Sequence, residues 1–404
     1  MIVGASLAGA KAAETLREEG FGGSIVLVGE EAERPYERPP LSKSYLLGRD
    51  DRESVFVHPE GWYAEHDVDL RRGVAATGID RAARSVALAD GGEVAYDKLL
   101  ITTGARPRRL NVPGGDLEGL LYLRTVSDSE RLGAAFRGGG RVVVAGAGWI
   151  GLETAAAARE LGCEVTVAEP APGALHQSIG LEVGAVFAGL HRDHGVALRF
   201  GEGVSEFRGA GGRLTAVVTS AGAELPADVA VVGIGVVPNS GLAEAAGLEV
   251  SNGILTDTAL RTSDPDIYAA GDVTNAVNPL LGRRVRVEHW ANALNSGPAA
   301  ARSMLGQAVR YDRVPYFFSD QYDLGMETAG LPEPGTYDQV VWRGDVGARE
   351  FIAFWLADGA VAAGMNVNVW DVNDAIQDLI RAGAAGHRVD TARLADPDVP
   401  LGEV

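Results

Sequence analysis

The segment RVVVAGAGWIGLE, residues 141–153, decides the fold of this chain. Its valines are typical of a buried strand, its three glycines of a tight turn, and the alanine-rich residues from Glu153 to Leu161 of a helix. A second apolar strand, Glu164–Ala168, follows and ends at Glu169. Strand, glycine turn, helix, strand and acidic residue in this order predict a dinucleotide-binding βαβ unit, in which a pyrophosphate lies on backbone N–H groups at the start of the helix.

The same unit opens the chain. Ile2-Val3 leads into GASLAG (4–9), a helix is expected over residues 10–19, and a strand over 24–28 leads to Glu30. Ser6 replaces the middle glycine, and the few residues before Gly4 make the first strand either unusually short or cut at its start. Two copies of one nucleotide-binding unit in a single chain predict two nucleotide-binding domains.

Composition excludes several classes of function. A chain of 404 residues is long enough for two or three domains. Its net charge of −19 argues against nucleic-acid binding, which needs a basic face. No apolar run is long enough to span a membrane, and no secretory signal opens the chain, so a cytoplasmic location is expected. The single cysteine, Cys163, forbids an intramolecular disulfide and a redox-active dithiol.

Further strands are expected over residues 98–105, 228–235 and 266–272, and a helix over 291–305. Beyond Tyr311 the pattern changes to paired strands, 351–356 and 361–369, around an Asp358-Gly359 turn, with a helix over 372–381. The last twenty residues are rich in proline and aspartate and are expected to form a tail. His191 and His194 have no third ligand nearby, so we expect a solvated helix end and no metal site.

Seven motifs, which include the two glycine loops, occur in a fixed order along the chain. In these motifs the chain resembles the FAD-dependent ferredoxin reductases that serve oxygenases. The motifs are GASLAG (4–9), RPPLSK (38–43), TTGARP (102–107), GAGWIGLE (146–153), GIGVVPN (233–239), IYAAGDV (267–273) and VEHWANAL (287–294). The resemblance implies an α/β fold of glutathione-reductase-like architecture, with two Rossmann-like domains and a C-terminal α+β domain. The expected boundaries are 1–109 and 237–312 for FAD, 110–236 for NAD, and 313–404 for the C-terminal domain.

The resemblance also implies the site. Lys43 would pair with Glu153 beside the reactive edge of the flavin, where a fixed positive charge favours the anionic reduced ring. Asp272 would bind the ribitol chain, and Trp290 would lie near the ring, although helix-dipole stabilisation of Glu153 and core packing of Trp290 are simpler explanations. The remaining expected cofactor-binding residues are Gly4, Ser6, Leu7, Ala8, Gly9, Glu30, Arg38, Thr103, Gly104, Arg124, Gly146, Gly148, Ile150, Gly151, Glu169, Gly235, Gly271, Glu288 and His289.

Glu169 also bears on the choice of nucleotide. A carboxylate accepts hydrogen bonds from the ribose hydroxyls of NADH and repels the 2′-phosphate of NADPH. No basic residue follows it before His176, so NADH is expected rather than NADPH. Because Cys163 is alone, electrons would leave directly from the flavin.

The expected partner is an iron–sulfur ferredoxin, and the expected assembly is a monomer or homodimer. A basic patch of Arg283, Arg284 and Arg286 is the candidate docking surface in an otherwise acidic chain. Two alternatives stay open. One is another acceptor, such as a rubredoxin, a quinone, an organic radical or oxygen. The other is a redox sensor similar to apoptosis-inducing factor.

Overall fold

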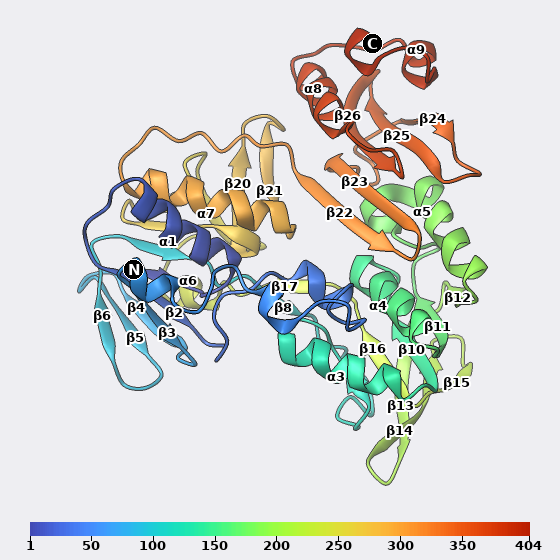
Figure 1. Ribbon diagram of the computed structural model, residues 1–404, viewed down its shortest axis with the longest axis horizontal. Coiled ribbons are helices and arrows are strands. Elements are labelled where there is room, and N and C mark those ends of the chain that lie inside the picture. The colour runs from blue at the N-terminus through green and yellow to red at the C-terminus, as the bar shows by residue number, and fades with distance from the viewer. The chain divides into compact units, whose positions relative to one another are not determined.

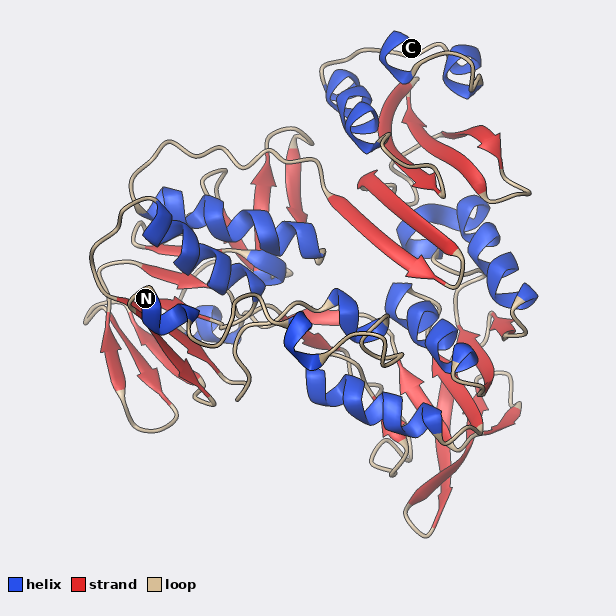
Figure 2. Ribbon diagram, in the orientation of Figure 1, coloured by secondary structure: helices blue, strands red, loops and turns tan.

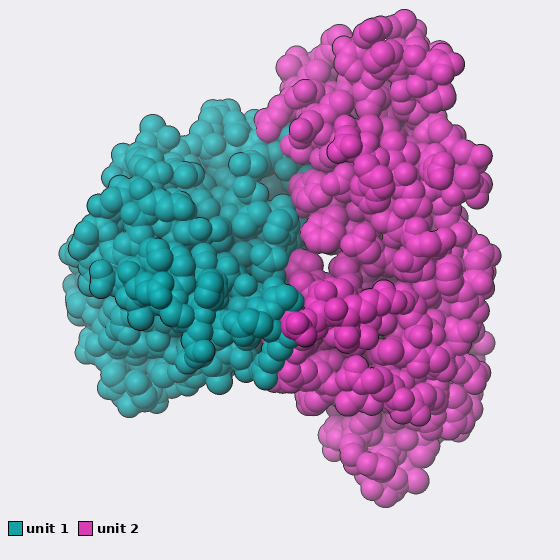
Figure 3. All heavy atoms as spheres, viewed as in Figure 1, with its two compact units in different colours: residues 1–37, 52–106, 236–315 teal, residues 38–51, 107–235, 316–404 magenta.

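The computed structural model describes all 404 residues. The chain divides into two compact units, shown in different colours in Figure 3. Unit 1 comprises residues 1–37, 52–106 and 236–315, and unit 2 comprises residues 38–51, 107–235 and 316–404. The chain therefore passes between the units several times, and each is described by itself below.

Unit 1 is built around a five-stranded parallel sheet with the order β19-β7-β1-β2-β3. Its strands are β1 (Ile2–Val3), β2 (Ile25–Gly29), β3 (Val68–Arg72), β7 (Leu99–Ile101) and β19 (Ile267–Ala269). Strand β1 lies in the middle, so the strand order reverses between β1 and β7. In an open parallel sheet, ligands bind at the carboxyl ends of the strands next to such a reversal.

Helices α1 (Leu7–Glu18) and α7 (Trp290–Met304) lie side by side on this sheet (Figure 1). The contact reaches the backbone, because a Cβ on Gly297 would stand 2.2 Å from the carbonyl oxygen of Ala8. The other elements of unit 1 are η2 (Arg52–Val55), α2 (Trp62–Glu65), β4 (Ala76–Asp80), β5 (Ser85–Leu88), β6 (Glu93–Ala95), β8 (Ala105–Pro107), β17 (Val236–Pro238), α6 (Gly241–Ala245), β18 (Ile254–Thr256), η3 (Gly271–Val273), β20 (Thr274–Asn278) and β21 (Arg283–Arg286).

Unit 2 repeats the parallel design with the order β12-β11-β10-β16-β9. The strands are β9 (Leu120–Leu121), β10 (Arg141–Ala145), β11 (Glu164–Glu169), β12 (Ala197–Phe200) and β16 (Val229–Val232). Its helical elements are η1 (Pro39–Ser42), α3 (Val126–Arg137), α4 (Trp149–Glu160) and α5 (His176–Asp193), and a small sheet contains β13 (Val204–Ala210), β14 (Arg213–Thr219) and β15 (Glu224–Pro226). Helix α4 begins four residues earlier than expected, directly after Gly148, whose extended backbone serves as its N-cap.

The C-terminal part of unit 2 is an antiparallel sheet with the order β22-β23-β26-β25-β24, shown as red arrows in Figure 2. Its elements are β22 (Tyr316–Gln321), β23 (Leu324–Gly330), β24 (Gln339–Asp345), β25 (Glu350–Ala357), β26 (Ala360–Val367) and α8 (Asn373–Ala384). The Asp358-Gly359 turn joins β25 and β26, and both residues have positive φ, as a two-residue hairpin turn requires.

The prediction that the last twenty residues form a tail is wrong. The last residues form α9 (Thr391–Ala395) and η4 (Leu401–Glu403), and Leu394 and Leu401 are buried. Arg343 on β24 holds this segment by donating hydrogen bonds to the carbonyl oxygens of four of its residues, Leu394, Asp396, Pro397 and Val399. Proline and aspartate content alone therefore misled the prediction, because the segment is ordered by a guanidinium some fifty residues earlier in the chain.

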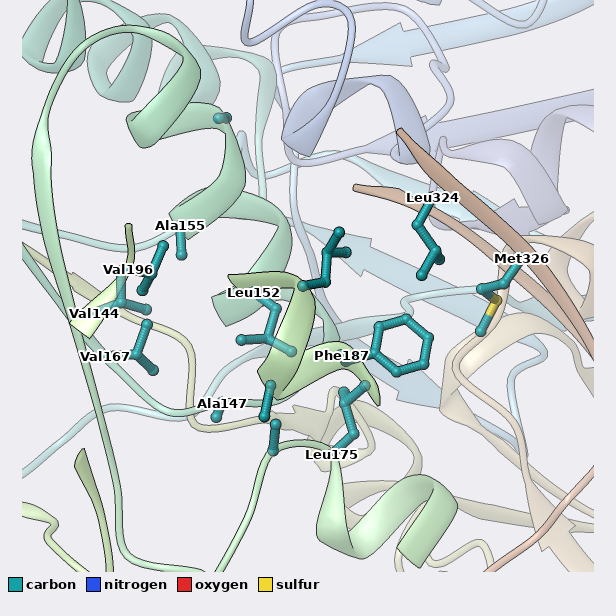
Figure 4. Packing of buried hydrophobic residues seen from close by; sticks show 14 of the residues in the cluster. Val144, Ala147, Leu152, Ala155, Val167, Leu175, Phe187, Val196, Leu324 and Met326 are labelled. Atoms are coloured by element: carbon teal, nitrogen blue, oxygen red, sulfur yellow. The ribbon is translucent and has the colours of Figure 1, made fainter. Parts of the chain in front are cut away.

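One hydrophobic core joins the parallel sheet of unit 2 to the C-terminal sheet (Figure 4). Val144, Leu152 and Phe187 belong to the parallel-sheet part, and Leu324 and Met326 on β23 pack into the same cluster. The C-terminal sheet is thus held against α4 and α5. None of the helices in the chain combines the length and the apolar character that crossing a bilayer requires.

Candidate functional site

The glycine loop after β1 has the geometry of a dinucleotide-binding turn. Gly4 has φ +117°, and a Cβ there would lie 2.2 Å from the backbone oxygen of Thr102. A Cβ on Gly9 would lie 2.2 Å from the oxygen of Gly4, so only glycine allows α1 to pack this closely on its own loop. These are the roles of the first and third glycines of the fingerprint.

The loop after β10 repeats this geometry. Gly146 has φ +106°, and a Cβ on Gly151 would lie 2.1 Å from the oxygen of Gly146. The middle glycine, Gly148, differs from both, because a Cβ there would meet no atom within 4 Å. Open space at the middle position is where a pyrophosphate approaches the backbone, so the loop fits a dinucleotide.

The two helices that follow the loops begin without side-chain caps and without acidic residues in the first turn. Ser6 is the N-cap of α1, yet its hydroxyl caps no backbone N–H. The first N–H groups of each helix therefore point out with no side chain in place to accept from them. That arrangement suits an anion at both positions. Leu7 and Ala8 are buried in the first turn of α1, whereas Ile150 in the first turn of α4 is 43% exposed.

The other candidates in unit 1 lie at the carboxyl ends of its parallel strands. Glu30 follows β2 and is exposed, Thr103 and Gly104 follow β7, and Asp272 follows β19. Gly271, with φ +75°, donates its backbone N–H to the Ser296 hydroxyl of α7 at 2.9 Å, which fixes the turn that carries Asp272. The predicted FAD-binding residues of this unit are thus gathered at one edge of the sheet.

Helix α7 brings a second group of candidates. It begins at Trp290, with His289 as its N-cap and no side-chain cap. Burial raises the pKa of the Glu37 carboxyl, and the nearby Trp290 side chain and Lys11 oppose that rise. Glu288 pairs with Arg286. The segment around Glu37 and the start of α7 therefore meet within unit 1.

In the second unit, Glu169 is held by the glycine loop itself. Its carboxylate accepts hydrogen bonds at 2.7 Å from the backbone N–H groups of Ala147 and Ala171, one on each oxygen. These bonds fix the carboxylate at the carboxyl end of β11, next to the loop of Gly146. Gly235, with φ +93° and open space at its Cβ position, lies between the ends of β16 and β17.

The structure brings Lys43 and Glu153 together. Lys43 Nζ lies 2.8 Å from Glu153 Oε1, and the two side chains are only 14% and 2% exposed. Two residues that sequence reasoning missed complete the pair: Ser42 donates to Glu153 Oε2, and Ser319 Oγ donates to Oε1 at 2.7 Å. Ser42 belongs to the RPPLSK motif and was available as a signal, whereas nothing near Ser319 in the sequence pointed to Glu153.

Two further candidates meet at the start of the same motif, where Arg38 donates to the backbone oxygen of Arg124. Two arginines of the expected basic patch on β21 have partners within unit 1. Arg284 donates to the carbonyl oxygens of Thr256 and Asn275, and Arg286 pairs with Glu288. The Glu288 carboxylate offsets the charge of Arg286, whereas bonds to carbonyl oxygens leave the charge of Arg284 in place, so β21 stays a candidate docking surface.

His191 and Cys163 are both buried. The prediction of a solvated helix end is wrong for His191, which has no exposed surface and whose Nε2 lies 2.8 Å from Gln321 Oε1. Burial lowers the pKa of His191 to about 4, although the bond to Gln321 opposes that shift. Cys163 donates its thiol to the Phe136 carbonyl oxygen, and burial raises the pKa of the thiol, so it is no thiolate nucleophile.

Comparison with known proteins agrees with this geometry. The family model for pyridine nucleotide-disulphide oxidoreductases matches residues 1–297, and the reductase C-terminal model matches residues 316–404. The chain belongs to the pyridine nucleotide-disulphide oxidoreductase family. As a member it is an oxidoreductase that binds FAD and a nicotinamide nucleotide, and its lone buried cysteine means that no disulphide of its own takes part.

Relatives within this family cover nearly the whole chain. The ferredoxin–NAD(+) reductase component of the anthranilate 1,2-dioxygenase system from Burkholderia cepacia is 43% identical over 99% of this chain and 98% of its own. The crystal structure of the ferredoxin reductase for the CYP199A2 system from Rhodopseudomonas palustris matches with a TM-score of 0.95 and 38% identity over 99% and 98% of the two chains. The covalent putidaredoxin reductase–putidaredoxin complex gives a TM-score of 0.93 and 36% identity over 100% and 96%.

Proposed function

We propose that this protein is an NADH-dependent ferredoxin reductase that supplies electrons to an oxygenase. One observation carries the proposal: the chain has two dinucleotide-binding loops, and its only cysteine is buried and hydrogen-bonded to a backbone carbonyl oxygen. A dithiol relay is impossible, so electrons taken from the nucleotide leave through the flavin. Relatives named as ferredoxin reductases of oxygenase systems support a ferredoxin as the acceptor.

We assign FAD to the domain formed by residues 1–109 and 237–312, NADH to residues 110–236, and the remaining residues 313–404 to the C-terminal domain. The first-turn N–H groups of α1 and α4 would each bind a pyrophosphate, and Asp272 would accept hydrogen bonds from the ribitol chain. When bound there, FAD would supply the chemistry that links a two-electron donor, NADH, to one-electron acceptors such as ferredoxin. We further infer a monomer or homodimer in the cytoplasm.

The protein's own residues would position and stabilise charge in this reaction, because hydride transfer needs no general acid or base. We propose that the Lys43–Glu153 pair faces the reactive edge of the flavin. There the ammonium would stabilise negative charge on the reduced ring, and the buried carboxylate would keep the ammonium in place. The open position at Gly148 and the exposed Ile150 would leave room for the nucleotide.

Stopped-flow spectroscopy of the FAD-loaded protein tests the proposal. We expect anaerobic NADH to bleach the yellow flavin within the turnover time, and an added iron–sulfur ferredoxin to restore the colour rapidly. A colourless protein that takes up no FAD would contradict the proposal. A reduced protein that keeps a long-lived charge-transfer band and ignores ferredoxin would favour a redox sensor, and rapid reoxidation by rubredoxin or quinone alone would favour another acceptor.

Replacing Glu169 with glutamine is expected to relax the preference for NADH. The variant removes the charge that would repel a 2′-phosphate, and like-charge contacts of this kind cost several kcal/mol. We expect the ratio of kcat/KM for NADH to that for NADPH to fall by about 10- to 100-fold in dye-reduction assays. Glu164→Gln, at the exposed start of the same strand, should leave the ratio unchanged. An unchanged ratio in Glu169→Gln would place the ribose elsewhere.

A further inference from the structure

A chain of buried polar side chains runs from Glu153 into the interior of unit 2. Ser319 donates to Glu153 Oε1, Gln321 Nε2 donates to Ser319 Oγ at 3.2 Å, and His191 Nε2 lies 2.8 Å from Gln321 Oε1. All four side chains are at most 3% exposed. Buried polar groups of this kind are costly unless each is satisfied, so a continuous chain of them calls for an explanation.

The hydrogen bonds in this chain all point the same way. An amide oxygen only accepts, so His191 carries its proton on Nε2 and donates to Gln321. Gln321 then donates to Ser319, and Ser319 donates to the carboxylate. Ser42 and Lys43 donate to that carboxylate from the other side. Three donors converge on Glu153, which suits a carboxylate that is acceptor-only, and therefore ionised.

Glu153 is the only charged member of this row of hydrogen-bonded side chains. His191 is fully buried and its pKa is lowered to about 4, so the ring is neutral near neutral pH. The Tyr322 ring meets the His191 ring edge-on, with 5.3 Å between the ring centroids, and stacks on His194 at 3.8 Å. A neutral histidine anchors Gln321 without drawing Glu153 away from Lys43. Within this hydrogen-bonded network, the only full charges are therefore the two of the ion pair. The Asp320 carboxyl next to it interacts with both of them, and burial raises its pKa.

We propose that Ser319 and Gln321 are positioning residues for the reaction: they hold the Glu153 carboxylate, and through it the Lys43 ammonium, at one place beside the flavin. Ser319 and Gln321 are two residues apart on β22, so both point to the same face of the C-terminal sheet. The proposal rests on the proposed function, which places the Lys43–Glu153 pair beside FAD. It assigns the C-terminal sheet a part in the reductive half of the reaction.

A buried ion pair needs such support. Taking an ammonium and a carboxylate out of water is repaid only if further hydrogen bonds satisfy the remaining lone pairs and fix the geometry. Ser42, next to Lys43 in the chain, supplies one of these bonds, and Ser319 supplies the other from 166 residues away. Without Ser319, Glu153 would keep its partner Lys43 but lose the contact that orients the shared oxygen.

The sequence provides a direct probe, because it contains only three lysines, Lys11, Lys43 and Lys98. In holoenzyme labelled with 13C-lysine, the two εCH2 protons of an immobilised lysine have separate NMR shifts, whereas those of a freely rotating one merge. We expect separate shifts for Lys43 in the parent and merged shifts in Ser319→Ala, with the Lys11 and Lys98 signals unchanged. Gln321→Met keeps Ser319 but removes the side chain that donates to it. In this variant we expect the difference between the two Lys43 εCH2 proton shifts to decrease without disappearing.

Hydride transfer provides the second readout. We expect Ser319→Ala to slow flavin reduction at saturating NADH by about tenfold, the loss of one hydrogen bond to a charged group, with little change in the NADH concentration for half-saturation. Ser319→Thr, which retains the hydroxyl, should recover most of the rate. Thr328→Val removes a buried hydroxyl from β23 of the same sheet, whose nearest partner is the Met326 sulfur at 3.9 Å, and should change neither readout.

A double-mutant cycle shows whether Ser319 acts through Glu153. In a Glu153→Gln background, Ser319→Ala should cause no further loss of rate. Full additivity there, or unchanged Lys43 signals and rate in both Ser319→Ala and Gln321→Met, would overturn the inference. If Glu153→Gln itself leaves flavin reduction unchanged in FAD-loaded protein, the proposed placement of the pair fails instead, so the two failures are distinguishable.

Discussion

Replacing Lys43 with methionine is expected to destabilise the protein and to slow its reduction by NADH. Glu153 is 2% exposed, and without Lys43 its charge would stay buried with no counter-ion. Breaking a buried pair in this way costs about 3–5 kcal/mol of unfolding free energy. Removing a fixed charge that stabilises the transition state costs about 10²–10³-fold in rate. Denaturant unfolding and stopped-flow flavin reduction measure the two effects.

The double variant Lys43→Met/Glu153→Gln separates stability from chemistry. It removes both charges, so we expect most of the lost stability to return while the rate stays low. Lys98→Met is the matched control, because Lys98 forms a pair with Asp266 in which the side chains are 39% and 22% exposed, and such surface pairs contribute about 1 kcal/mol or less. A Lys43→Met protein with parental stability and rate would contradict both the buried pair and its role.

The second large effect is expected at Gly148. Alanine there should weaken NADH binding and leave the fold intact, because its Cβ would enter the open space beside the loop and touch no protein atom. The backbone of Gly148, with φ −78°, suits alanine as well as glycine. We expect the KM for NADH to rise by about 10- to 100-fold, corresponding to about 1.4–2.8 kcal/mol, with the melting temperature unchanged.

Two other glycines of unit 2 provide the contrast. Gly151→Ala would place a Cβ 2.1 Å from the Gly146 oxygen, so α4 would have to move and the protein should lose stability as well as NADH binding. Gly189→Ala, on α5 with open space at the Cβ position, should leave the KM unchanged and stabilise the helix by up to about 1 kcal/mol. A normal KM in Gly148→Ala would mean that the pyrophosphate lies elsewhere.

Local signals predicted the parallel cores well. In each copy the glycine loop, its strands and helix, and the closing acid, Glu30 or Glu169, lie within about thirty residues of one another, so the pattern along the chain already contains the geometry. The hairpin at Asp358-Gly359 was predicted for the same reason. An Asp-Gly pair readily adopts the positive φ values that such a turn needs, and the pair is visible in the sequence itself. The resemblance added Lys43 as the partner of Glu153, although the two are 110 positions apart.

The errors came from residues whose environment is set by distant parts of the chain. His191 was expected at a solvated helix end, but it is hydrogen-bonded to Gln321, which lies 130 residues away in the sequence. The C-terminal residues resembled a tail but are bound by Arg343.

The sequence by itself determined that this protein has two dinucleotide-binding loops and no dithiol, because glycine spacing and a cysteine count need no tertiary information. Only the tertiary structure decided how the Lys43–Glu153 pair is supported. Ser42 and Ser319 approach Glu153 from 111 and 166 residues away, and no periodicity or spacing along the chain encodes contacts of that range. They arise because β22 and α4 pack together on a shared hydrophobic core, and because a buried carboxylate needs donors for the lone pairs that its counter-ion leaves free.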